Sequence, residues 1–160
     1  MKGITKEQAF YYGLLNIPMM IFLGGLEELG WRNILQPELE EKFSFGIASV
    51  LTSLIWAIWH LPLFFIAGTS QSGMNFGLFT VMIFGMSFAL ASIYYVSKSI
   101  WLCILFHTII NAFSSIWIIN EDILTRVITL VVLIIFSFIL VIYSSIKRKS
   151  LLNNQSYIKE

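Results

Sequence analysis

The chain has 160 residues, of which 58% are hydrophobic and 12% are charged, and its mean hydropathy is +0.82. Soluble domains usually carry about twice this share of charged residues, so the composition argues against a soluble domain and indicates a membrane protein. The net charge of +1 gives no reason to expect a nucleic-acid partner. The single cysteine, Cys103, excludes a disulfide framework within the chain.

Five apolar segments are each long enough to cross a bilayer as a helix, for which about 20 residues suffice. We predict them at about residues 10–34, 45–66, 75–96, 100–119 and 123–146. The chain has no Asp, Glu, Lys or Arg between Phe43 and Ser97. We therefore expect an all-α, polytopic transmembrane helix bundle of about five spans. Residues 1–150 would form its single domain and residues 151–160 a polar carboxyl-terminal tail.

The Lys and Arg residues near the segment ends predict an orientation, because cytoplasmic loops carry an excess of these residues. One side collects Arg32, Lys42, Lys98, Lys147, Arg148 and Lys149, and the other collects Lys2, Lys6 and Arg126. We therefore expect an integral membrane protein whose amino terminus lies outside and whose carboxyl terminus lies in the cytoplasm.

The first apolar segment ends in a charged cluster that contains Glu27, Glu28 and Arg32. A charge at membrane depth costs at least about 2.5–3.5 kcal/mol, so such a cluster indicates a functional site. The only two histidines of the chain, His60 and His107, also lie inside apolar segments. This small set of ionisable residues predicts chemistry inside the bilayer.

The spacing of these residues predicts that they meet. The first two segments form a hairpin that turns near Phe43, and Glu27 and His60 each lie roughly 25 Å from that turn. The third and fourth segments turn near Lys98, which places His107 about 13 Å from its own turn. We expect Glu27, His60 and His107 to share one cavity below the cytoplasmic surface.

Three pairs of residues are four positions apart, so that each pair shares one helix face: Glu28 and Arg32, Trp56 and His60, and His107 and Asn111. In this order, the patterns Glu27-Glu28-x-x-x-Arg32, Trp56-x-x-x-His60 and His107-x-x-x-Asn111 resemble the motifs of a known family. This is the CAAX prenyl endopeptidase and bacteriocin-processing protease family, also called the CPBP or Abi family. The resemblance covers roughly residues 10–115.

The resemblance implies a glutamate-dependent intramembrane endopeptidase, in the bacterial plasma membrane, that cleaves a membrane-associated peptide or a CAAX-type lipidated tail. It implies that Glu27 is the general base, that His60 helps to activate water, that His107 and Asn111 stabilise the oxyanion, and that Glu28, Arg32 and Trp56 support the site. No cofactor is expected. The expected partners are membrane lipid and a peptide or lipidated-protein substrate.

Two alternatives stay open at the level of sequence. Glu27, His60 and His107 supply two imidazoles and a carboxylate, which is an acceptable zinc set and would make the protein a zinc-dependent protease.

Because family members commonly have additional helices before the glutamate motif, the chain is expected to be a shortened homologue, an incomplete gene product or a protein that completes its cavity as a homo-oligomer. The short chain also fits a non-catalytic bacteriocin-immunity or scaffold protein of the membrane.

Overall fold

The computed structural model describes residues 6–117 and 123–157, with side chains for residues 10–113 and 123–150. The described residues form helices and no strand, which confirms the prediction of an all-α bundle. The α-helices are α1 (Lys6–Leu23), α2 (Glu28–Gly30), α3 (Gln36–Glu40), α4 (Phe45–His60), α5 (Phe76–Ser97), α6 (Ile100–Trp117) and α7 (Ile123–Tyr157). The first seven residues of the predicted polar tail therefore continue α7 as helix.

Three stretches of the described chain are helical, long and apolar enough to cross a membrane: Phe45–Phe65, Phe76–Ser97 and Ile123–Ser150. A further apolar helix, Ile100–Phe113, is shorter. These helices match the second to fifth predicted segments within a few residues, although the predicted end at residue 119 lies outside the described residues. The protein is thus a helical membrane bundle.

The first predicted segment, at residues 10–34, is not one helix, and this part of the prediction was wrong. Helix α1 ends at Leu23, and a 3-10 turn, α2 and a π-helical turn then lead to α3. Two glycines at the break face α6. A Cβ atom on Gly24 would overlap the side-chain amide of Asn111, and one on Gly25 would overlap the hydroxyl of Thr108. The missing side chains let the broken segment approach α6 closely.

Helix α3 is tied to α4 by one buried amide. Gln36 is almost completely buried, accepts a hydrogen bond from the Thr52 hydroxyl at 2.8 Å and donates one to the Ser49 hydroxyl at 3.1 Å. Buried polar groups of this kind are costly unless they are paired, so these bonds fix one register for the hairpin. The turn follows α3 near Phe43, as the sequence predicts.

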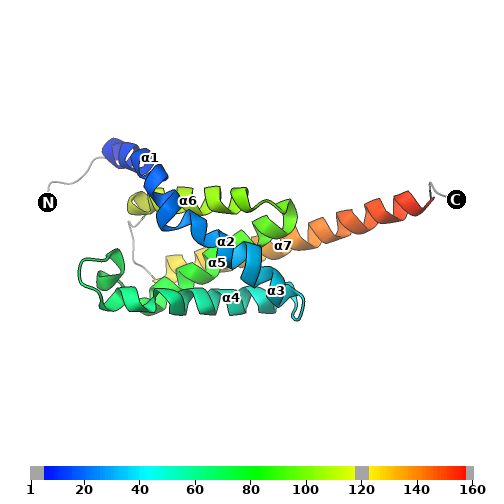
Figure 1. Cartoon of the computed structure of the whole chain (residues 1–160), viewed down its shortest axis with the longest axis horizontal. Coiled ribbons are helices and arrows are strands. Elements are labelled where there is room, and N and C mark those ends of the chain that lie inside the picture. Colours follow the sequence, from blue (N-terminus) through cyan, green and yellow to red (C-terminus); the bar gives the residue numbers. More distant parts are fainter. Residues whose placement is uncertain (1–5, 118–122, 158–160) are drawn as a thin grey trace.

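Figure 1 shows how the remaining helices are arranged. Helix α1 lies along α6, α5 lies between α4 and α7, and the carboxyl-terminal part of α7 extends beyond the bundle. The buried apolar core comes from α4, α5 and α6 and contains Trp56, Ala57, Phe79, Ile83, Leu90 and Cys103. The break between α1 and α3 crosses this core, which brings its acidic residues next to Trp56.

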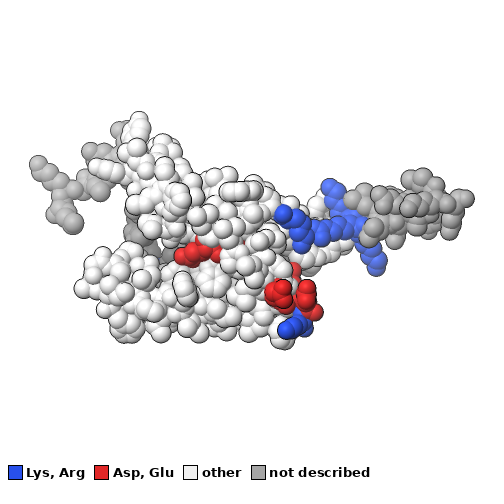
Figure 2. All heavy atoms as spheres, in the orientation of Figure 1, with Lys and Arg blue, Asp and Glu red and all other residues white. Residues whose placement is uncertain are grey.

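Figure 2 shows where charged side chains gather on one surface of the molecule. Lys and Arg side chains gather along the carboxyl-terminal part of α7, and acidic side chains gather at the end of α3, with a basic side chain beside them. Lys2, which the orientation argument used, lies outside the described residues. The orientation of the chain across the membrane stays a prediction.

Candidate active site

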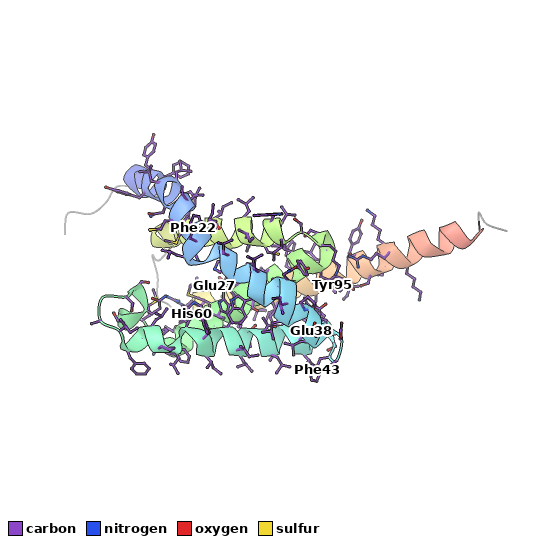
Figure 3. The ribbon with its side chains drawn as sticks, viewed as in Figure 1. Phe22, Glu27, Glu38, Phe43, His60 and Tyr95 are labelled. Carbon is purple, nitrogen blue, oxygen red and sulfur yellow. The ribbon has the colours of Figure 1, made fainter. Side chains whose placement is uncertain are left out.

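The two adjacent glutamates face different surroundings. Glu28 is completely buried, as is Arg32, whereas Glu27 is partly exposed. Figure 2 shows one acidic patch in the middle of an uncharged surface, and Figure 3 labels Glu27 at this place, opposite His60. Adjacent residues on a helix point about 100° apart. One carboxylate can therefore point inward while the other points toward a face of the molecule.

Glu28 is the centre of a buried charge network. Its Oε2 atom lies 3.4 Å from Nε of Arg32, and its Oε1 atom lies 2.8 Å from Nδ1 of His107. Arg32 also donates a hydrogen bond from Nη2 to the carbonyl of Ser87 at 3.1 Å. The Glu28–Arg32 pair is therefore present as the four-residue spacing predicts. The contact with His107 fastens the broken segment to α6.

Glu27 is held by two indole groups. Nε1 of Trp56 donates a hydrogen bond to Oε2 of Glu27 at 2.9 Å, and Nε1 of Trp31 donates to the same oxygen at 3.3 Å. The sequence analysis did not single out Trp31 and so missed this bond. The signal was available, because Glu27 and Trp31 are four positions apart and share a helix face.

His60 ends α4 and is oriented by the backbone of its own helix. Its Nδ1 atom lies 2.9 Å from the carbonyl oxygen of Trp56, which can only accept a hydrogen bond, so Nδ1 carries the proton. In the neutral ring, Nε2 is then an acceptor. The imidazole lies between two aromatic rings, with centroid distances of 6.0 Å to Trp56 and 5.3 Å to Phe79.

His107 and Asn111 lie on α6 and face the break after α1. Nε2 of His107 lies 3.3 Å from the position that a Cβ atom on Gly24 would take, and Nδ2 of Asn111 lies even closer to that position. Because a carboxylate accepts hydrogen bonds, Nδ1 of His107 donates to Glu28. This bond sets the orientation of the ring and directs Nε2 toward Gly24 and Asn111.

Trp56 is the point at which these groups meet. Its indole N–H bonds Glu27, and its rings lie 5.3 Å from the His107 ring and 6.0 Å from the His60 ring. In the described part of the chain no hydrogen bond joins Glu27 directly to either histidine. The structure therefore gathers the predicted base and both predicted histidines around one tryptophan, which the sequence had suggested only as a supporting residue.

The alternative zinc set does not fit this arrangement. Glu27, His60 and His107 do not form a group that could hold a metal ion, and among the described residues no other three His, Cys, Asp or Glu side chains do.

Comparison with known proteins identifies the family. Residues 10–113 match the family model described as type II CAAX prenyl endopeptidase, Rce1-like. The chain belongs to this family. The match includes every residue of the three motifs discussed above, and it confirms the resemblance on which the sequence analysis relied.

A curated member of the family gives a second comparison. The chain is 29% identical over 134 residues to CAAX prenyl protease 2 of the archaeon Methanococcus maripaludis, and the match covers 78% of this chain. It covers 48% of the archaeal protein, so the chain spans about half the length of this relative. No solved structure matches the chain.

Proposed function

We propose that the chain is an intramembrane endopeptidase that hydrolyses a membrane-associated peptide or a CAAX-type lipidated tail with water activated by Glu27 and His60. One observation carries this proposal: Glu27, His60 and His107 come from three distant segments and gather around Trp56 in a chain of this family. The printed name of the archaeal relative supports the class of substrate.

Glu27 is the proposed general base. Both indole bonds go to Oε2, so Oε1 is the oxygen that would take a proton from water. As the water oxygen adds to the peptide carbonyl carbon, its proton passes to Glu27 and then to the leaving nitrogen when the C–N bond breaks. Nε2 of His60, an acceptor in the neutral ring, would hold the same water.

His107 and Asn111 are the proposed donors to the oxyanion that forms on the carbonyl oxygen. For Nε2 of His107 to donate, the ring must be doubly protonated, because its Nδ1 proton is already bonded to Glu28. Each such donor is worth about 2.7–4 kcal/mol of transition-state stabilisation.

Replacement of Glu27 tests the mechanism. We expect Glu27→Gln, purified and placed in lipid nanodiscs, to lower kcat/KM on a prenylated CAAX peptide by at least about 10²-fold, since the amide cannot act as a base. Glu38→Gln is the matched control, because Glu38 is an exposed glutamate of α3. A Glu27→Gln protein that cleaves as fast as the parent would overturn the proposed role.

A further inference from the structure

An apolar groove lies outside the candidate active site, between the amino-terminal end of α4, the middle of α5 and the middle of α7. It has a volume of about 550 Å³ and is lined by residues 44–47 and Val50, by Phe88, and by Phe138, Val141 and Ile142. This volume is in the range of sites that bind small molecules, about 300–1,000 Å³. Its lining is almost entirely hydrocarbon, which suits an alkyl chain.

Two cations lie beyond one end of this groove and share one aromatic ring. Nζ of Lys98 lies 4.9 Å from the Tyr95 ring centroid, and the guanidinium carbon of Arg148 lies 5.3 Å from it. Arg148 also donates a hydrogen bond to the Tyr95 carbonyl at 2.9 Å. Within residues 10–113 and 123–150, neither cation forms an ion pair with a carboxylate. Their positive charge is therefore available to an external anion.

The groove and the cations are structurally continuous. The Phe45 ring, which lines the groove, packs against Tyr95 with a centroid distance of 5.9 Å and against Phe138 at 5.7 Å. The Tyr95 hydroxyl bonds Ser145, which lies between Ile142 and Arg148 on α7. One surface of α5 and α7 thus leads from hydrocarbon to positive charge, as an amphipathic ligand requires.

We propose that this surface binds one anionic phospholipid, with an acyl chain in the groove and the phosphate between Lys98 and Arg148. The acyl chain accounts for the apolar groove, and the phosphate accounts for the two cations. The location agrees with a membrane–water boundary, because α5 ends at Ser97 and the candidate membrane span of α7 ends at Ser150. Basic residues at this boundary attract anionic headgroups. The proposal does not depend on peptidase activity.

Lipid retention in native mass spectrometry tests the proposal. The full chain is released from nanodiscs that contain phosphatidylcholine and phosphatidylglycerol, and bound phosphatidylglycerol is counted. We expect the parent to retain one molecule and Lys98→Gln/Arg148→Gln to retain it about tenfold less. The matched control is Lys147→Gln/Lys149→Gln, which removes the same charge from the same end of the molecule and should change retention less than about twofold.

A second variant tests the groove without touching the cations. Ile142 is exposed, so Ile142→Trp can fill the groove while the fold is kept, and we expect it to lower retention as strongly as the loss of both cations. If Lys98→Gln/Arg148→Gln and Lys147→Gln/Lys149→Gln lowered lipid retention equally, the proposal would be overturned, because a general attraction of the lipid to basic residues would then explain the binding. Unchanged retention in Ile142→Trp, or displacement of the lipid by inorganic phosphate alone, would also overturn it.

Discussion

The buried charge network offers a direct test of how the broken segment is held, and Glu28→Gln is the informative change. The variant keeps the size of the side chain and removes its charge. Arg32 would then keep its charge in a completely buried position with no carboxylate beside it, and its Nε and Nη1 atoms already make no hydrogen bond among the described residues. His107 would lose the carboxylate that accepts its Nδ1 proton.

The magnitude follows from the burial of both charges. Breaking a buried ion pair by removing one partner costs about 3–5 kcal/mol, since the other charge stays uncompensated. For a chain of this size, each kcal/mol changes Tm by about 2–4 °C, so we expect Glu28→Gln to lower Tm by roughly 6–20 °C. Removing both charges should cost less, because apolar replacement of a whole buried pair is often neutral.

Thermal unfolding in nanodiscs, followed by far-UV circular dichroism, measures these values. The set consists of the parent, Glu28→Gln, Arg32→Met, the double variant Glu28→Gln/Arg32→Met and the exposed control Glu38→Gln. We expect the double variant to be more stable than Glu28→Gln alone and the control to lie within about 0.5 kcal/mol of the parent. Additive losses in the double variant, or a Glu28→Gln protein as stable as the control, would refute the assigned network.

Three further outcomes follow from the site. Gly24→Ala should destabilise the protein by about 1–3 kcal/mol, because its Cβ atom would overlap a side chain of α6. Gly30→Ala is the control and should not destabilise it, since nothing lies within 4 Å of that Cβ position. Thermal unfolding compares the two variants. Trp31→Phe should lower kcat/KM about 10-fold or more through loss of a charge-assisted bond to Glu27, and the exposed Trp59→Phe should not. A chelator should leave peptide cleavage unchanged in the same assay, and loss of activity that zinc restores would contradict the metal-free mechanism.

Local spacing allowed much of the site to be predicted from sequence. The Glu28–Arg32 contact follows from two oppositely charged residues four positions apart on a helix. The hairpin turn near Phe43 follows from the polar residues that separate two apolar segments, and it correctly brings the acidic cluster beside α4. Residues equidistant from a hairpin turn lie at a similar depth in the bundle. Counting residues from the turn therefore placed Glu27 opposite His60, which is one helical turn from its actual partner, Trp56.

The remaining features depend on contacts between distant segments, which spacing does not specify. The segment after Leu23 approaches α6 closely at Gly24 and Gly25, and a sequence shows the glycines without showing what approaches them. The Glu28–His107 contact joins residues 79 positions apart. An apolar run of suitable length is typical of a straight span, so hydropathy alone favoured a single first helix over the interrupted one.

The break has a chemical consequence for two adjacent acids. Glu28 takes both the guanidinium and an imidazole and is completely buried, whereas the hydrogen bonds to Glu27 come from neutral indoles and its side chain is partly exposed. Because the same short segment carries both residues, the ion pair can hold the segment against α6 without neutralising the proposed base. The contacts with Arg32 and His107 thus distinguish the two glutamates: Glu28 holds the segment in place, and Glu27 remains the proposed base.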